Sequence, residues 1–376
     1  MPPPPRLPTS AKALVVRKSA NPTKPVFHDA VIETRPIPAL KPGELLVKVN
    51  AVAFNHRDSW IRKGLYPGIG FGNPFGTDGA GIVVAAADVS DPLLNKRVFF
   101  NPTRGWISDP DAPETTRPFT HAMGGSVTAV GASAFTAFGT FAEYVVVERE
   151  EVLETPAHLD DVHAAAWPLG GLTAWRATMI NGGVVSGDNV LITGVGGGVA
   201  LLAMQLCVAR GANVYVTSGS PEKIRQAVEL GAKGGVSYKD NGWPTHLRKL
   251  LDQHGGGLLS TVIDSAGGDI MTKTSPLLKQ GGRVVVYGMH AHPAVTMTMR
   301  EVMRNQRMLG STMGSRADMR AATAFLAAHR LVPAVSHVLD GLEAAREGFD
   351  LLERGEQFGK IVLRIGRGAD EAKAML

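Results

Sequence analysis

One segment near the middle of the 376-residue chain restricts its fold more than any other. Residues Asn189–Arg210 read NVLITGVGGGVALLAMQLCVAR: an apolar run, a cluster of glycines, and a second apolar run of helical length. Glycines permit a tight turn and a close approach of the backbone to a ligand, and a helix N-terminus presents unpaired N–H groups to an anion. The segment therefore predicts a buried strand, a turn, and a helix whose first residues bind a phosphate.

The glycines match the dinucleotide-binding pattern G-x-G-x-x-G/A only in part. In one register the first position is valine, and in the other register the last position is valine. A tight strand-to-helix turn without a ligand therefore stays open as an alternative. The backbone positions expected to line a pyrophosphate are Gly194, Gly196, Gly197, Gly198 and Val199.

The pattern of apolar residues changes along the chain around this segment. Between residues 161 and 311, short apolar runs such as TVIDS and GRVVVYG alternate with helical segments, as in a parallel sheet built from βαβ units. Between 11 and 160 the runs alternate with polar residues and are broken by Pro and Gly, which indicates a β-rich domain. We predict an α/β protein with a doubly wound parallel sheet over 161–311, a β-rich domain over 11–160 and 312–376, and a disordered proline-rich tail over 1–10.

Composition limits the class of protein. A domain averages roughly 150 residues, so 376 residues favour two domains. Lys and Arg number 39 against 34 Asp and Glu, and this formal charge of +5 is scattered rather than gathered in a basic tract, so we expect no nucleic-acid partner. The single cysteine, Cys207, excludes an intrachain disulfide and a zinc site with several thiolates, and it favours reduced, cytoplasmic surroundings. Glycines interrupt two long uncharged stretches, 122–142 and 190–209, so we expect no membrane span.

The strand expected after the glycine turn ends without an acidic residue. A site that prefers NAD commonly carries Asp or Glu there, which holds the ribose 2′-hydroxyl. This chain has VTSGSPEK instead, in which Ser218 is neutral and Lys223 brings a cation within reach of a 2′-phosphate. The sequence therefore predicts NADPH as the cofactor, and the alternative that Lys223 is only a solvated helix residue stays open.

Eight short motifs, in the same order along the chain, resemble the medium-chain dehydrogenase/reductase superfamily and, within it, the zinc-free quinone oxidoreductase and enoyl reductase branch. They are VNAVAFNHRDSWIRKGLYPG, GTDGAGIVV, GTFAEYVVV, PLGGLTAW, the glycine turn, VIDSAGG, GGRVVVYG and FGKIVLRI. The resemblance implies a GroES-like β-barrel catalytic domain, a Rossmann domain, a cofactor cleft between them, and a homodimer or homotetramer. We expect the apolar segment 284–289 to pair edge to edge with a second subunit.

The metal-binding positions of this superfamily are replaced here. In zinc-dependent members a Cys, a GHE motif and a second Cys or Asp hold the catalytic zinc. This chain has Asn55 at the first position, Thr77 in place of the His, and Leu169 near the third. A four-Cys structural zinc lobe is impossible with one cysteine. We therefore predict that the protein binds no metal.

Without a metal, a conjugated acceptor suits hydride transfer best, because the negative charge spreads onto a distant oxygen. The resemblance places Asn55 and Asp58 on the floor of the nicotinamide and substrate cleft. Arg57, or the neighbouring His56, is the candidate donor to a developing oxyanion. Tyr66 is a further candidate proton donor, and the alternative that it only anchors a loop beside Pro67 and Gly68 stays open. Asn and Asp also cap helices, so a structural role for Asn55 and Asp58 stays open.

The resemblance also assigns contacts to the cofactor. Thr173 is expected beside the nicotinamide, and Gly359 with Lys360 beside its ribose or phosphate. Tyr238 is expected to flank the 2′-phosphate. Gly288 is expected where the cofactor passes so close that a side chain would collide with it.

These patterns predict a zinc-independent, NADPH-dependent oxidoreductase that transfers hydride to a small-molecule quinone or enone. Two alternatives remain: a zinc-free carbonyl reductase or alcohol dehydrogenase, which needs a strong proton donor, and a nucleotide-binding protein without turnover. The insertion at 101–138 either lines the mouth of a pocket or covers the barrel.

Overall fold

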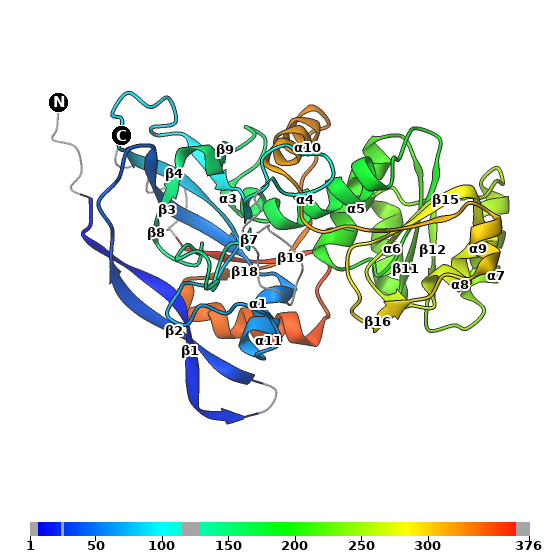
Figure 1. Cartoon of the computed structure of the whole chain (residues 1–376), viewed down its shortest axis with the longest axis horizontal. Coiled ribbons are helices and arrows are strands. Elements are labelled where there is room, and N and C mark those ends of the chain that lie inside the picture. Colours follow the sequence, from blue (N-terminus) through cyan, green and yellow to red (C-terminus); the bar gives the residue numbers. More distant parts are fainter. Residues whose placement is uncertain (1–6, 24–25, 115–127, 366–376) are drawn as a thin grey trace. The chain divides into compact units, whose positions relative to one another are not determined.

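The computed structural model describes residues 7–23, 26–114 and 128–365 (Figure 1). The chain forms two compact units. Unit 1 comprises the chain up to Leu169, residues 315–320, and the chain from Val335 onward, and unit 2 comprises residues 170–314 and 321–334. Residues 1–6 of the predicted tail lie outside the described ranges, and the first strand begins at Ser10.

The parallel sheet of unit 2 confirms the predicted α/β fold. Its strands lie in the order β12-β11-β10-β13-β15-β17, and every neighbouring pair is parallel. The chain winds from β10 outward through β11 and β12, then resumes on the other side with β13, so the strand order reverses between β10 and β13. A ligand site in such a sheet lies at the carboxyl ends of the strands where the order reverses.

The bounds of the elements of unit 2 are as follows. The strands are β10 Asn189–Ile192, β11 Asn213–Ser218, β12 Gly234–Ser237, β13 Leu259–Asp264, β14 Gly267–Gly268, β15 Leu278–Val286, β16 His292–Val295 and β17 Arg307–Gly310. The helices are α4 Pro168–Trp175, which begins in unit 1, then α5 Gly198–Ala209, α6 Pro221–Glu229, α7 Trp243–Gln253, α8 Ile270–Thr274, α9 Met299–Met303 and α10 Arg316–Ala328, with a π-helical turn at Arg176–Asn181 and a 3-10 turn at Ser275–Leu277.

Two features of unit 2 differ from the sequence-based expectation. Residues 321–334 belong to unit 2 rather than to the β-rich domain, because Phe325 of α10 packs on Trp175 with a ring-centroid distance of 5.5 Å. The expected pairing edge at 284–289 is wrong, because β15 lies between β13 and β17 and pairs with both. Strand β17, not β15, is at the edge of the sheet.

Unit 1 is rich in strands, as predicted. A seven-stranded sheet has the order β18-β19-β3-β4-β5-β9, with β8 also paired to β3, and β1 and β2 form a separate antiparallel hairpin. The strands are β1 Ser10–Thr23, β2 Val26–Pro36, β3 Glu44–Ala53, β4 Asp78–Ala86, β5 Arg97–Phe100, β6 Thr103–Arg104, β7 Thr128–Ala129, β8 Tyr144–Glu148, β9 Val152–Glu154, β18 Val335–Asp340 and β19 Lys360–Arg364. The helices are α1 His56–Arg62, α3 Asp161–Ala165 and α11 Ala345–Arg354, with 3-10 turns at Arg149–Glu151 and Leu342–Ala344.

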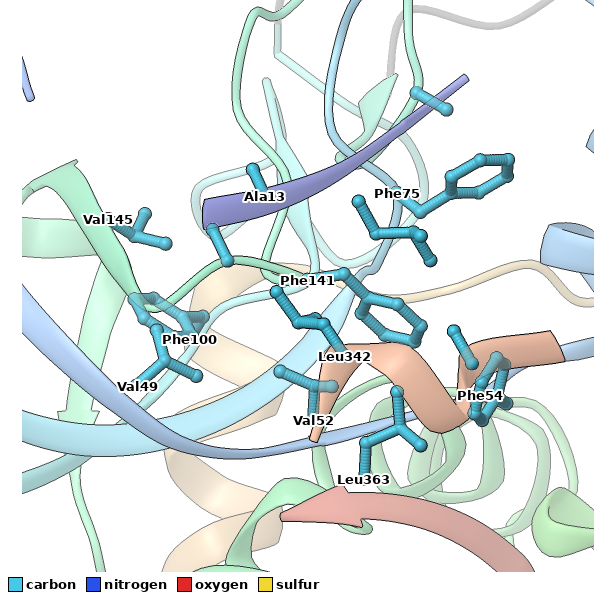
Figure 2. Packing of buried hydrophobic residues seen from close by; sticks show 14 of the residues in the cluster. Ala13, Val49, Val52, Phe54, Phe75, Phe100, Phe141, Val145, Leu342 and Leu363 are labelled. Atoms are coloured by element: carbon cyan, nitrogen blue, oxygen red, sulfur yellow. The ribbon is translucent and has the colours of Figure 1, made fainter. Parts of the chain in front are cut away.

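The core of unit 1 is centred on aromatic rings that pack edge to face. The Phe54 ring lies 5.0 Å from the Phe141 ring and 5.1 Å from the Phe349 ring, at interplanar angles of 90° and 72°. Figure 2 shows Phe54, Phe75 and Phe141 among the aliphatic side chains that surround them. Phe141 and Phe349 hold the Phe54 ring in place, and this packing fixes the position of the next residue, Asn55, at the border of the core.

No helix within the described ranges combines the length and the apolar character needed to cross a bilayer.

The contact between α11 and Phe54 leaves no room for a side chain at Gly348. A Cβ at this position would lie 2.2 Å from Phe54 Cε2. Gly348→Ala should lower the free energy of unfolding by about 1–3 kcal/mol, because the added methyl group overpacks the core. The higher helix propensity of alanine should offset up to about 1 kcal/mol of this loss. Urea unfolding of the purified protein measures the difference.

The matched control is Gly310→Ala in β17, where a Cβ would meet no atom within 4 Å. This control should unfold at nearly the wild-type urea concentration. Equal stability of the Gly348→Ala variant and the wild type would contradict the tight packing of α11 on Phe54.

Candidate functional site

The glycine turn joins β10 to α5 in the conformation that the sequence predicts. Gly194 and Gly196 have φ of +67° and +126°, a region that residues with a side chain rarely adopt. The turn is bound to the end of β11, because Val195 N–H donates to the Thr217 carbonyl at 2.8 Å and Gly194 N–H to Thr217 Oγ1 at 3.2 Å. Helix α5 starts directly after Gly197, so its first-turn N–H groups, at Gly198 and Val199, have no partner within the helix. The turn therefore has the geometry that receives a phosphate.

Hydroxyl and amino groups gather at the carboxyl ends of β11 and β12. A Cβ at Gly196 would lie 2.7 Å from Lys223 Cδ, so the Lys223 side chain runs across the glycine turn. A Cβ at Gly219 would lie 2.6 Å from the Tyr238 hydroxyl and 2.9 Å from Lys239 Cε. Ser218 is buried beside them at the end of β11. Of the residues predicted for a 2′-phosphate, Ser218 and Tyr238 are thus at the ends of the neighbouring strands β11 and β12, and Lys223 is in the first turn of α6.

The acids nearest to this group along α6 are already neutralised. Arg225 donates to Glu222 at 2.6 Å and also pairs with Glu229. Ser220 caps α6 by accepting the Lys223 N–H at 3.4 Å. The helix therefore presents Lys223 to the turn, while Arg225 is occupied on the exposed side.

A buried acid that the sequence analysis did not single out connects the central strands of unit 2. Asp264, at the end of β13, accepts from Thr193 Oγ1 at 2.6 Å and from the Gly267 N–H at 2.8 Å. Burial raises the pKa of Asp264, and these two hydrogen bonds oppose that shift. The signal in the sequence was an aspartate at the end of an apolar run, in VIDSAGG.

The other predicted cofactor contacts are placed as follows. In unit 2, Thr173 is nearly buried on α4 and its hydroxyl lies 3.9 Å from Met313 Sδ. A Cβ at Gly288 would lie 3.0 Å from His290 Cε1, so this position is crowded by the chain itself. Gly359 belongs to unit 1 and has φ of +108°.

The centre of the polar site in unit 1 is a buried cluster of Asn55, Asp78 and Lys360. Lys360 Nζ donates to Asn55 Oδ1 at 2.7 Å and to Asp78 Oδ2 at 2.8 Å, and Asn55 Nδ2 donates to Asp78 Oδ2 at 3.0 Å. The exposed fractions are 8% for Asn55, 0% for Asp78 and 5% for Lys360. The three side chains therefore bind one another away from water.

Strand register brings these three residues together. Ala53 of β3 is opposite Asp78 of β4 on one side and Val362 of β19 on the other. Asn55 follows Ala53 by two residues and Lys360 precedes Val362 by two, so all three side chains meet at one end of the sheet. The Phe54 N–H, which donates to the Ile361 carbonyl at 3.0 Å, continues the pairing to that end.

Asp58 lies beside this cluster but has a different environment. Its Oδ2 accepts the Asn55 N–H at 2.9 Å, while its Oδ1 is buried without a hydrogen-bond partner. Burial raises the pKa of Asp58 to about 6, although the Arg57 guanidinium, 3.8 Å away, and the Asn55 N–H act in the opposite direction. Its contact with Asn55 is the helix-capping role that the sequence left open.

Arg57 is held by oxygen atoms of its own unit. Its Nη1 donates at 2.8 Å to both Thr77 Oγ1 and the Val130 carbonyl, and its Nη2 donates to the Gly131 carbonyl at 3.0 Å. The Tyr66 ring stacks on the guanidinium at 4.7 Å. Within the described residues the Tyr66 hydroxyl forms no hydrogen bond. Of the two candidates, Tyr66 has the freer polar group.

Two of the residues expected at metal-ligand positions, Thr77 and Leu169, have other partners here. Leu169 contributes its N–H, which donates to Asp78 Oδ1 at 2.7 Å, and Thr77 Oγ1 donates to the Val130 carbonyl at 3.2 Å. Across residues 7–23, 26–114 and 128–365, no three His, Cys, Asp or Glu side chains lie close enough together to share a metal ion. Residues 115–127 of the predicted insertion lie outside these ranges.

Comparison with known proteins gives two family matches. A model described as zinc-binding dehydrogenase matches residues 198–328, and a model described as alcohol dehydrogenase GroES-like domain matches residues 41–157. The chain is 40% identical over 350 residues to the zinc-type alcohol dehydrogenase-like protein YogA of Leptosphaeria maculans, which covers 90% of this chain and 96% of that protein. It is 30% identical over 336 residues to a zinc-type alcohol dehydrogenase-like protein of Schizosaccharomyces pombe, covering 87% and 92% of the two chains.

Two solved structures are similar over nearly the whole chain. A crystal structure of an NAD-dependent alcohol dehydrogenase has a TM-score of 0.78 and 32% identity, and it covers 94% of this chain and 100% of that chain. The crotonyl-CoA carboxylase/reductase AntE in complex with NADP has a TM-score of 0.81 and 22% identity, covering 97% of each chain. The second similarity shows the fold alone.

The raised pKa of Asp58 makes stability depend on pH. The folded protein holds the Asp58 proton more tightly than the unfolded chain, in which the pKa is near 3.8. The protonated carboxyl therefore contributes its full stabilisation to the folded state below pH 3.8, and this stabilisation is lost as the pH rises through about 6. Two pKa units correspond to about 3 kcal/mol. Asp58→Asn keeps an acceptor for the Asn55 N–H and does not titrate. As the pH rises from about 4 to about 7, the free energy of unfolding of the variant should therefore increase by about 3 kcal/mol relative to that of the wild type.

Urea unfolding of both proteins across this pH range measures the difference. Asp269→Asn, a substitution at an exposed aspartate of unit 2, is the control and should follow the wild type at every pH. A stability difference between Asp58→Asn and wild type that does not change with pH would disprove the shifted pKa.

Proposed function

Because the chain belongs to the medium-chain dehydrogenase/reductase superfamily, among its zinc-type alcohol dehydrogenase-like members, we propose that it transfers hydride from NADPH to a conjugated acceptor without a catalytic metal. The acceptor is a quinone or an α,β-unsaturated carbonyl compound. Membership of the superfamily makes the protein an oxidoreductase that uses a nicotinamide nucleotide, and the choice of NADPH, of acceptor and of metal-free chemistry is our proposal.

The observation that carries the proposal is the content of the buried cluster in unit 1. Zinc prefers thiolate, imidazole or carboxylate ligands in a tetrahedral array. Here the single carboxylate, Asp78, accepts from Lys360 and Asn55 on one oxygen and from the Leu169 N–H on the other. Thr77 is held by Arg57. A zinc ion would have to displace an ammonium and would find one carboxylate as its strong ligand, so the donor set does not fit zinc.

Conjugated acceptors suit a site of this kind. Hydride delivered to the carbon at the far end of a conjugated system leaves its negative charge on an oxygen, where hydrogen bonds and a proton donor stabilise it. The Arg57 guanidinium lies 4.7 Å from the centre of the Tyr66 ring, and among the residues that the structure describes the Tyr66 hydroxyl has no hydrogen-bond partner. We assign proton donation to Tyr66. Arg57 Nη1 already donates to Thr77 Oγ1 and to the Val130 carbonyl, so we assign to Arg57 the role of fixing these residues in place.

The residues at the strand ends of unit 2 support NADPH as the hydride donor. Lys223 of α6 runs across the glycine turn, and the Tyr238 hydroxyl lies beside Gly219, next to Ser218 at the end of β11. The nearby Glu222 is neutralised by Arg225. A 2′-phosphate is favoured by such donors and repelled by the acid that holds a 2′-hydroxyl. Cytoplasmic location and a homodimer or homotetramer remain part of the proposal.

The proposed activity predicts that the purified protein, treated with a chelator, oxidises NADPH in the presence of quinones or α,β-unsaturated ketones. Simple aldehydes and alcohols should react slowly, because nothing in the cluster polarises their oxygen as a metal does. The loss of NADPH absorbance over one panel of acceptors gives the rates, and elemental analysis gives the metal content.

Three results would contradict the proposal. Turnover confined to simple aldehydes favours a carbonyl reductase, and NADPH binding without turnover favours a binding protein. Stoichiometric zinc whose removal abolishes activity means that the cluster rearranges around a metal.

The cofactor assignment is tested by Ser218→Ala with Lys223→Ala. Hydrogen bonds to a charged group contribute about 1.5–3 kcal/mol, so the double variant should bind NADPH roughly 10- to 100-fold more weakly. NADH lacks the phosphate, so its dissociation constant should change little. Fluorescence titration with both nucleotides measures the two constants.

Lys249→Ala, at an exposed lysine of α7, is the matched control for the loss of one positive charge. Equal losses of NADH and NADPH affinity in the double variant would reject the assignment of these residues to the 2′-phosphate.

A further inference from the structure

Lys360, which the sequence analysis assigned to the cofactor, is engaged within its own unit. Its ammonium lies 2.7 Å from Asn55 Oδ1 and 2.8 Å from Asp78 Oδ2. Its side chain is 5% exposed and that of Asp78 is 0% exposed. A buried ammonium is stable only where a carboxylate and other acceptors replace its water. Asn55 and Asp78 take two of the three N–H groups of Lys360, so moving the side chain to a cofactor phosphate would break both interactions.

We propose that Lys360 is a positioning residue of the reaction centre: its ammonium fixes the Asn55 amide and supplies the positive charge beside Asp78, instead of contacting the cofactor. The inference rests on the proposed function, because it assigns part of the geometry of that reaction. In this proposal the Asn55 amide is the group that Lys360 orients, and it donates a hydrogen bond to the reacting molecule.

The two neighbours of Asn55 determine which way its amide faces. An ammonium has only donors, so the atom 2.7 Å from Lys360 Nζ must be the amide oxygen. A carboxylate has only acceptors, so the atom 3.0 Å from Asp78 Oδ2 must be the amide nitrogen. The opposite orientation would place donor against donor and acceptor against acceptor.

One hydrogen of the Asn55 amide is left for a ligand. The NH₂ group carries two hydrogens, and Asp78 accepts one of them. In the part of the chain that the structure describes, Asn55 Nδ2 has no other hydrogen-bond partner. Lys360 and Asp78 therefore hold a neutral N–H donor in a fixed direction, which is the type of group that stabilises a developing oxyanion.

The same ammonium excludes a divalent cation from Asp78. Two cations that share one buried carboxylate at hydrogen-bond distance repel each other strongly, because little water lies between them to screen the charge. Metal-free chemistry and the position of Lys360 are thus two consequences of one arrangement.

The test uses Lys360→Met in the full-length protein, because methionine has similar length and no charge. NADPH affinity is measured by fluorescence, and kcat with the best acceptor is divided by the concentration of NADPH-binding sites, so unfolded protein does not count. A misplaced donor costs about 100-fold in rate, so kcat should fall by that order while the NADPH dissociation constant stays at the wild-type value. Lys48→Met, at an exposed lysine of β3, is the control and should match wild type in both.

A second pair of variants separates positioning from stability. Lys360→Met leaves Asp78 as an unpaired buried charge, whereas Asp78→Asn with Lys360→Met removes both charges, so the melting temperature should recover in the double variant. Because Lys360 acts through Asn55, adding Lys360→Met to Asn55→Ala should lower kcat no further than Asn55→Ala alone.

Two results would overturn the assignment. Weaker NADPH binding with unchanged kcat would place Lys360 at the cofactor, and additive losses with Asn55→Ala would mean that it does not act through Asn55. If the wild type reduces no acceptor, the proposed function fails separately. In that case recovery of the melting temperature together with unchanged NADPH binding supports the position of Lys360, and failure of either refutes it.

Discussion

The ion pair between Lys360 and Asp78 is the interaction on which the site in unit 1 depends. Removing two charges from water costs several kcal/mol for each, and their attraction offsets this only with good geometry and further hydrogen bonds. Asp78 meets the condition by accepting from Lys360 and Asn55 on one oxygen and from the Leu169 N–H on the other. The pair joins the start of β4 to the start of β19, 282 residues apart in sequence. The geometry of the site therefore depends on the register of β3 with β4 and β19.

Two aspartates of this region have different roles because their surroundings differ. Asp78 faces an ammonium and is satisfied on both oxygens. Asp58 has one oxygen bound to the Asn55 N–H and the other buried without a partner, and burial raises its pKa to about 6. The first acid fixes a charge and an amide orientation, and the second fixes the start of α1. Between them, Asn55 is held through both its backbone and its side chain.

The proposed nucleotide-binding residues of unit 2 have a more local origin. The glycine turn, the neutral end of β11 and the start of α6 lie within about thirty residues of sequence, and β-α-β geometry alone brings them to one edge of a parallel sheet. The hydrogen bond from Thr193 to Asp264 then links β10 to β13, where the strand order reverses. The proposed function draws on a phosphate-binding turn in unit 2 and on a polar cluster without metal ligands in unit 1.

The sequence by itself determined the fold class and the glycine turn, because both depend on residue type and local spacing. That Asn55, Thr77 and Leu169 stand at the positions of metal ligands was implied by the resemblance to a known family. The resemblance also singled out Asn55, Asp58 and Tyr66 as candidate catalytic residues and Lys360 as a cofactor contact. The sequence could not determine that Lys360 faces Asn55 and Asp78, that Asp58 caps α1, or that β17 forms the sheet edge. Only the tertiary structure decided these points, because strand register brings distant residues into contact and burial makes each polar group depend on the partner it meets there.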